Sequence, residues 1–223
     1  MIISFVNQKG GVGKSTLSFH FANWLRDRGF SVALYDADAQ ASSSKWLIAY
    51  GADISSTLID TQNIDGIPDQ ILELDDKHDF TICDGPGGLG EVTRTLLILS
   101  DFALFPITAS YLDADSLTKA RAQLDYAIKI KGKAPESRVI LNRIRKRSKL
   151  AIETREAQES LGIPVLQSSV RDLDGFRIAS QEKTVVWKGL GNIGVNATKD
   201  LEALFQEIAK LIGLESNKRV ANG

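Results

Sequence analysis

The chain carries Lys9-Gly10-Gly11-Val12-Gly13-Lys14-Ser15-Thr16 directly after the apolar run Ile2–Val6. An apolar strand, a glycine-rich turn and a helix start, in this order, form a cradle for nucleotide phosphates. Glycines let successive backbone N–H groups turn toward the phosphates, and the following helix adds its positive N-terminal end. We therefore expect residues 10–16 to bind a nucleotide, with Lys14 at the β- and γ-phosphates and the Ser15 hydroxyl on Mg²⁺.

This phosphate loop departs in two ways from the common pattern G-x-x-x-x-G-K-S/T. The pattern requires glycine at position 8, where the chain has Gln8, and a second lysine, Lys9, precedes Lys14. A loop lysine taken alone is usually just solvated, but Lys9 is the first residue of an eight-residue motif. The functional prediction depends on this extra lysine.

The composition restricts the class of protein. With 223 residues, 43% of them apolar, the chain is long enough for one substantial α/β domain and too short for two comfortable ones. The net charge of −1 gives no global attraction to nucleic acid or membrane, so such binding needs local patches. The single cysteine, Cys83, excludes a disulfide framework. The sequence shows neither a signal-peptide pattern nor an apolar run near the roughly 20 residues of a membrane span, so we expect a cytoplasmic protein.

Short apolar runs alternate with longer amphipathic ones, which predicts an α/β fold: a mainly parallel, twisted sheet flanked by helices. Strands are expected at Ile2–Val6, Ser31–Tyr35, Phe80–Cys83, Ala103–Ile107 and Arg138–Leu141, with shorter ones near Leu58, Val165 and Val185. Helices are expected at Lys14–Arg28, Gln40–Ala49, Gly66–Leu74, Gly90–Leu99, Ala114–Lys131, Lys149–Leu161 and Ala197–Ile212. We expect one domain over residues 1–214 and a flexible tail over 215–223.

Acidic side chains follow two of the predicted strands. Asp36 and Asp38 end the second strand, where side chains two positions apart share a face, and Asp84 ends the strand that begins at Phe80. Because the carboxyl ends of parallel strands meet at one edge of a sheet, we expect all three near the phosphate loop. A single aspartate after a strand more often starts a turn, but three beside a phosphate loop favour a metal site, with Asp84 contacting Mg²⁺ through water.

Three segments together resemble a known family. Residues 7–16, then Asp36-Ala37-Asp38-Ala39-Gln40, then Asp84-Gly85-Pro86 are similar to the deviant Walker A, Walker A′ and Walker B motifs of the ParA-type partition ATPases. These proteins belong to the ParA/MinD group of P-loop ATPases. The resemblance covers nearly the whole chain in the family's order, and it implies a P-loop NTPase fold with ATP and Mg²⁺ as cofactors.

The resemblance also implies a role for each matching residue. Lys9 would be the signature lysine, which reaches across a nucleotide-sandwich homodimer to the other subunit's phosphates. Lys14 would be the loop lysine and Ser15 the Mg²⁺ ligand. Asp36 would support the metal site, and Asp38 would position the hydrolytic water.

Three further positions bear on this resemblance. Asn142, at the end of the predicted strand near Leu141, matches the family's adenine-reading position. Ala39 replaces the usual proline of the Walker A′ motif, and Gly87 replaces the second proline of the Walker B motif. Neither replacement removes a charge or a metal-binding group, so an ATPase is still implied. Its intrinsic turnover is expected to be slow, since no arginine finger is evident.

Other members of the group share the same ATPase core. A nitrogenase iron protein needs two cysteines per subunit, which the single cysteine excludes. A MinD-like membrane-cycling protein would end in a basic amphipathic helix, whereas the last predicted helix carries Asp200, Glu202 and Glu207 opposite its apolar stripe. Core packing is the better interpretation of that helix, and no membrane partner is expected. Two alternatives stay open: a MinD-like membrane-cycling positioning ATPase, and a metabolic or maturation ATPase that never touches DNA.

The ParA-type interpretation implies that the ATP-bound dimer binds DNA without sequence preference. Residues 142–149 hold five basic residues and no acid, which suits contacts to DNA phosphates. Arg171 lies in a segment similar to one that contributes to DNA binding in the family. The expected DNA contacts are therefore Arg143, Arg145, Lys146, Arg147 and Arg171.

The expected biological role follows from this interpretation. A ParB-like or cargo-adaptor protein would stimulate hydrolysis and release the dimer, so that a plasmid, a chromosome region or another cargo is segregated. We expect a nucleoid-associated protein in the cytoplasm. The chain starts on its first strand, so no N-terminal helix-turn-helix that reads an operator is expected.

Overall fold

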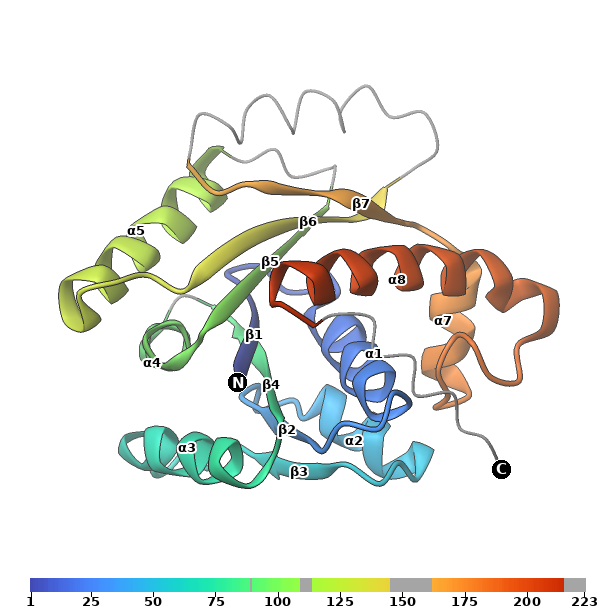
Figure 1. Ribbon diagram of the computed structural model, residues 1–223, viewed down its shortest axis with the longest axis horizontal. Coiled ribbons are helices and arrows are strands. Elements are labelled where there is room, and N and C mark those ends of the chain that lie inside the picture. The colour runs from blue at the N-terminus through green and yellow to red at the C-terminus, as the bar shows by residue number, and fades with distance from the viewer. Residues whose placement is uncertain (89, 109–113, 145–161, 215–223) are drawn as a thin grey trace.

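The computed structural model describes residues 1–88, 90–108, 114–144 and 162–214. Its centre is a sheet of seven strands in the order β3-β2-β4-β1-β5-β6-β7, and every pairing between neighbours is parallel (Figure 1). The strands are β1 (Ile2–Asn7), β2 (Val32–Asp36), β3 (Ser55–Leu58), β4 (Phe80–Gly87), β5 (Phe102–Thr108), β6 (Glu136–Ile144) and β7 (Val165–Arg171). The predicted fold class is confirmed.

Helices cover both faces of this sheet. Figure 1 shows α1, α2, α7 and α8 on one side and α3, α4 and α5 on the other. The helices are α1 (Lys14–Arg26), α2 (Ser42–Tyr50), α3 (Ile67–Lys77) with a short 3₁₀ turn before it (Ile64–Gly66), α4 (Glu91–Leu99), α5 (Ala114–Lys131), α7 (Asp174–Gln181) and α8 (Gly191–Leu211).

The two hydrophobic cores follow from the alternation of side chains along each strand. In β1, Ile3 and Phe5 pack into the core beneath α1 and α8, whereas Ile2 and Val6 pack into the core on the opposite face. All four are at most 3% exposed. A strand that is apolar on both faces is stable only between two layers of helices, which is why the sequence of β1 is continuously apolar.

The carboxyl ends of the strands form the edge that bears the phosphate loop. β1 leads into the loop, and β2 and β4 lie next to each other, with Asp36 opposite Asp84 in register. β4 continues to Gly87, so the glycines after Asp84 extend the strand where a turn was expected. The sheet thereby places both aspartates at the same height beside the loop.

One edge of the sheet is covered by carboxylates from α8. The register of β6 and β7 shifts between Val139 and Leu141. In β7, the backbone N–H groups of Gln167 and Ser168 both donate to the Glu207 carboxylate, each at 2.7 Å. Further along, Arg171 donates its backbone N–H to Asp200 at 3.0 Å. These bonds explain why Asp200 and Glu207 lie on α8 opposite its apolar stripe.

The predicted helix at the C-terminal end is confirmed as a core element, but it starts earlier than expected. α8 begins at Gly191, and Leu201, Leu204, Phe205 and Ile208 are at most 1% exposed. A Cβ at Gly194 would lie 2.3 Å from the Val186 carbonyl oxygen, so the first turn of α8 requires glycine there. Among the described helices, none has the length and apolarity to cross a bilayer.

One prediction from the pattern of residues is wrong, and one helix was missed. The strand expected near Val185 does not form, because this residue lies in the connection between α7 and α8, where it is fully buried. Its apolar neighbours were predicted as a strand from their β-branched character, whereas packing beneath α1 explains them. The helix α7 was not predicted at all. The helix expected at Lys149–Leu161 lies outside the described residues.

Candidate functional site

The phosphate loop joins β1 to α1 in a conformation that requires glycine. Gly11 and Gly13 have φ angles of 76° and 96°, in the left-handed region, and Gly13 is the residue immediately before α1. A Cβ at Gly13 would lie 2.2 Å from Nδ2 of Asn142. The start of the loop is held by Asn7, which donates to the Pro106 carbonyl at 2.6 Å and accepts the Lys9 N–H at 3.0 Å.

Lys14 lies beneath this loop and is almost fully buried, at 6% exposure. Its Nζ donates to the carbonyl oxygen of Lys9 at 3.2 Å. Burial lowers the pKa of Lys14, while the charges of Asp84 and Asp38 act to raise it. A buried ammonium group next to two carboxylates and a loop of backbone N–H groups is suited to binding an anion.

Asp84 is fully buried, and neither of its oxygens has a hydrogen-bond partner among the described residues. Burial first and the charge of Asp36 second raise the pKa of this carboxyl from 3.8 to about 7. The nearby hydroxyls of Ser15 and Ser43 and the charge of Lys14 act in the opposite direction. A buried carboxylate without a partner is costly, so the site fits a cation or a cation-bound water.

Asp36 is just as buried but is fully bonded. One oxygen accepts the Asp38 N–H at 3.1 Å, and the other accepts the Ser44 N–H at 2.9 Å. Asp36 therefore fixes the backbone that carries Asp38. Asp38 is half-buried and accepts the Gln40 N–H at 3.0 Å, and it lies near enough to Lys14 to raise the pKa of that amine.

The donor set suits magnesium bound together with phosphates. No group of three acidic, histidine or cysteine side chains gathers around one point in the described part of the chain. Mg²⁺ is commonly held by one or two protein oxygens, by water and by the phosphates of its nucleotide. Ser15 and Asp84 are the residues that would supply the protein oxygens.

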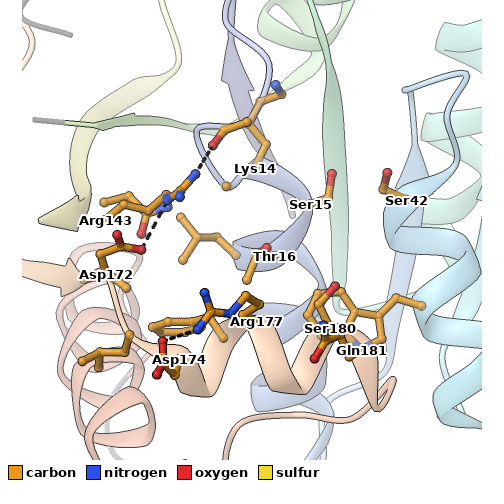
Figure 2. Close-up of a pocket in the computed structure, with 18 of the residues that line it drawn as sticks. Lys14, Ser15, Thr16, Ser42, Arg143, Asp172, Asp174, Arg177, Ser180 and Gln181 are labelled. Atoms are coloured by element: carbon orange, nitrogen blue, oxygen red, sulfur yellow. Dashed lines mark hydrogen bonds and ion pairs between the residues drawn. The ribbon is translucent and has the colours of Figure 1, made fainter. Parts of the chain in front are cut away.

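A cleft of about 860 Å³ opens from the phosphate loop. It is lined by the start of α1, by α2, by the end of β6 and by the segment from β7 into α7 (Figure 2). Thr16, Asn142, Arg143, Asp172 and Phe176 are among the residues that line it. This volume is sufficient for a nucleotide whose phosphates rest on the loop.

The comparison with family models gives one match over most of the chain. Residues 3–186 match the model described as the CobQ/CobB/MinD/ParA nucleotide-binding domain. The chain belongs to the ParA/MinD family of nucleotide-binding ATPases. The glycine loop, the buried lysine and the strand-end aspartates are thus the expected nucleotide site of a ParA/MinD protein.

Relatives within the ParA/MinD family cover between about half and most of the chain. The maintenance of carboxysome distribution protein A (McdA) of Halothiobacillus neapolitanus is 32% identical over 211 residues, which cover 92% of this chain and 95% of that protein. The sporulation initiation inhibitor protein Soj of Bacillus subtilis is 27% identical over 157 residues, covering 53% of this chain and 62% of Soj. A variant McdA of Cyanothece in complex with ATP has the same fold, with a TM-score of 0.77, 16% identity and coverage of 96% of both chains.

The helix α7, which forms one wall of the cleft, was not predicted from the sequence. Leu173, Phe176 and Ala179 follow one another at a spacing of three, and Asp174 lies in the first turn. This is a helical pattern, but it extends over only eight residues, too few for the periodicity to stand out. Asp172 and Arg177 also line the cleft and were not among the expected site residues of this ParA/MinD chain.

The two described arginines that were expected to contact DNA make contacts within the chain. Arg171 binds Asp200 through Nε and Nη2, the latter at 2.7 Å. Arg143 faces the phosphate loop and donates to the Gly11 carbonyl oxygen at 3.2 Å. The other expected contacts, Arg145, Lys146 and Arg147, lie outside the described residues.

Proposed function

We propose that this chain is an Mg²⁺-dependent ATPase that positions a cargo. In this proposal its ATP-bound dimer binds DNA without sequence preference and leaves it when a partner protein stimulates hydrolysis. The observation that carries the proposal is a buried lysine, Lys14, next to a buried Asp84 that lacks a partner among the described residues. Both lie beneath a glycine loop that begins with a second lysine, Lys9.

Each residue of the site has a task in this proposal. The N–H groups of residues 10–16 and the Lys14 ammonium hold the phosphates. Ser15 and Asp84 hold Mg²⁺, which when bound offsets the negative charge of the β- and γ-phosphates. Asp38 orients a water molecule toward the γ-phosphorus. The water oxygen forms a bond to phosphorus, the bond to the bridging oxygen breaks, and ADP and phosphate are the products.

The dimer and the slow turnover follow from the same residues. Lys9 would extend to the phosphates of the second subunit, so that nucleotide binding and dimerisation are coupled. In this proposal Asp38 alone orients the water. Each arginine that lines the described cleft is already paired with an acid, and Arg143 is also bonded to the loop. A slow intrinsic rate would leave control of hydrolysis to a partner protein.

The DNA-binding part of the proposal rests on the basic segment that begins at Asn142. Five basic residues within residues 142–149 suit the phosphates of any DNA sequence. The similarity to a protein named for maintaining carboxysome distribution supports a cargo-positioning role. A ParB-like or adaptor protein would determine which cargo is carried.

The two lysines provide the first test of this proposal. Lys14→Ala is expected to abolish ATP binding, measured by calorimetry. Lys9→Ala is expected to keep ATP binding but to lose ATP-dependent dimerisation, measured by light scattering. Lys77→Ala is the matched control, because Lys77 pairs only with Glu73 at an exposed site on α3. A Lys9→Ala variant that dimerises and hydrolyses normally would overturn the proposal.

A salt titration of DNA binding provides the second test. With ATP, the chain is expected to bind DNA of unrelated sequence, and the affinity should fall steeply between about 50 and 200 mM salt. With ADP, binding should be lost. If neither nucleotide supports binding at low salt, the metabolic or maturation ATPase that does not touch DNA becomes the better interpretation.

A further inference from the structure

The end of β6 contains an irregularity directly beside the phosphate loop. Leu141 pairs with Ser169 of β7 and Ile144 pairs with Arg171, so β6 has one residue more than β7 in this interval. Within it, Arg143 has a φ angle of 55°, in the left-handed region that glycine usually occupies. An extra residue of this kind is a β-bulge, and bulges next to functional sites turn a side chain in a new direction.

The bulge turns two consecutive side chains onto two consecutive carbonyl groups of the phosphate loop. Asn142 is buried and donates from Nδ2 to the Val12 oxygen at 2.7 Å. Arg143 donates from Nη1 to the Gly11 oxygen at 3.2 Å. The Arg143 guanidinium also pairs with Asp172 at 3.5 Å, as Figure 2 shows, and Asp172 follows β7, the strand next to β6.

Holding these carbonyl groups also sets the direction of the neighbouring N–H groups. In a trans peptide the carbonyl oxygen and the N–H point in opposite directions. With the Gly11 oxygen held by Arg143, the N–H of Val12 points away from Arg143. With the Val12 oxygen held by Asn142, the N–H of Gly13 is fixed in the same way. A phosphate loop works only when its N–H groups, not its carbonyl oxygens, face the phosphates.

We propose that Arg143 is a positioning residue of the nucleotide site: the bulge directs its guanidinium onto the Gly11 carbonyl, which holds the phosphate loop ready for phosphate. This inference rests on the proposed nucleotide binding and replaces the expectation that Arg143 contacts DNA. A left-handed arginine is strained and persists where its surroundings impose it. The bonds of its guanidinium to the Gly11 carbonyl and to Asp172 are what impose it here.

The strained backbone makes a decisive experiment available. Arg143→Gly removes the guanidinium but relieves the left-handed conformation, so the variant is expected to be at least as stable as the wild type in urea. Its affinity for MgADP, measured by calorimetry without DNA, is expected to fall by roughly tenfold, as for the loss of one charge-assisted hydrogen bond. Arg121→Ala is the control, because Arg121 pairs with Asp125 at an exposed site on α5.

A lysine at position 143 separates positioning from simple charge. Arg143→Lys keeps the charge that a DNA phosphate needs, but it lacks the fork that joins Gly11 and Asp172. If Arg143 positions the loop, Arg143→Lys should bind MgADP more tightly than Arg143→Gly but less tightly than the wild type. The salt dependence of DNA binding should be unchanged in Arg143→Gly, Arg143→Lys and Arg143→Ala. If Arg143→Gly binds MgADP like the wild type and loses about one unit of salt slope, Arg143 is a DNA contact and the inference fails. If the wild type itself does not bind MgADP, the proposed function fails, and this inference with it.

Discussion

Asp36 and Asp84 lie opposite each other on neighbouring strands, and both are fully buried, yet their bonding is opposite. The Asp36 carboxylate accepts two backbone N–H groups from the segment that follows it. The Asp84 carboxylate has no hydrogen-bond partner among the described residues. The same residue type at the same height of the sheet thus serves two purposes.

In our proposal, Asp36 is an acid that holds the backbone and Asp84 is an acid that meets the nucleotide-bound cation. A carboxylate that accepts backbone N–H groups contributes to the folded state and keeps its segment in one conformation. A buried carboxylate without a partner destabilises the free protein, and it is retained where a ligand later supplies the missing charge. Four substitutions and conditions test this division, beginning with the largest expected effect.

Replacing Asp36 is expected to destabilise the protein most. Asp36→Ala leaves the N–H groups of Asp38 and Ser44 without an acceptor, which lowers the free energy of unfolding by about 3 kcal/mol. Urea denaturation at neutral pH measures this change. Asp36→Asn keeps one acceptor oxygen and should lose less. Equal stability of Asp36→Ala and wild type would show that Asp36 has no structural role.

Replacing Asp84 is expected to act in the opposite direction on the free protein. Asp84→Asn removes a buried charge, so the free energy of unfolding without nucleotide should rise by about 2 kcal/mol at pH 8. The same variant should lose most of the stabilisation that MgADP gives, which for wild type is about 2.7 kcal/mol at one hundred times the dissociation constant. If Asp84→Asn is instead less stable than the wild type without nucleotide and is fully stabilised by MgADP, Asp84 is a structural acid like Asp36.

The pH dependence of stability sharpens the comparison. Burial raises the pKa of Asp84 from 3.8 to about 7, so between these values the folded protein binds a proton that the unfolded chain has released. The titration of Asp84 therefore does not lower the free energy of unfolding below about pH 4. It lowers the free energy of unfolding progressively as the pH rises from there through 7. The difference in unfolding free energy between Asp84→Asn and wild type, measured without Mg²⁺, should grow over this range. A constant difference would contradict the raised pKa.

The smallest effect is expected from the serines of α2. The Ser43 hydroxyl lowers the pKa of Asp84, so Ser43→Ala should move the midpoint of that pH dependence upward. The stability at pH 5 should change by less than about 1 kcal/mol, because the Asp84 carboxyl is neutral at that pH and carries no charge for the hydroxyl to stabilise. Ser44→Ala is the control, since Ser44 bonds to Asp36 and Ser56 and should leave the midpoint unchanged.

The central part of the fold and the residue types of the site could be predicted because their signals are local. The glycine loop, the apolar strand before it and the aspartates at strand ends each occupy a few consecutive residues. Parallel strands then bring Asp36 and Asp84 to one edge without further information. The bonding that distinguishes these two aspartates depends on the path of residues 37–44, which no local pattern specifies.

The errors came from features that only packing decides. The segment around Val185 is apolar because it is buried beneath α1, and it is neither extended nor paired. α7 is too short for its spacing of apolar residues to be distinguished from chance. The assignment of Arg143 to DNA came from the local density of charge and stays a prediction, whereas no local pattern could indicate the extra residue in β6 that turns its side chain toward the phosphate loop.

The carboxylates of α8 on the edge of β7 also affect how molecules of this protein meet. An uncovered edge strand offers its N–H groups to any extended segment and invites open-ended aggregation. Here Glu207 and Asp200 already accept the N–H groups of Gln167, Ser168 and Arg171, so the sheet does not continue from one molecule into the next at this edge. These acids thus act against edge-to-edge pairing through β7, which leaves the proposed ATP-dependent dimerisation to other surfaces.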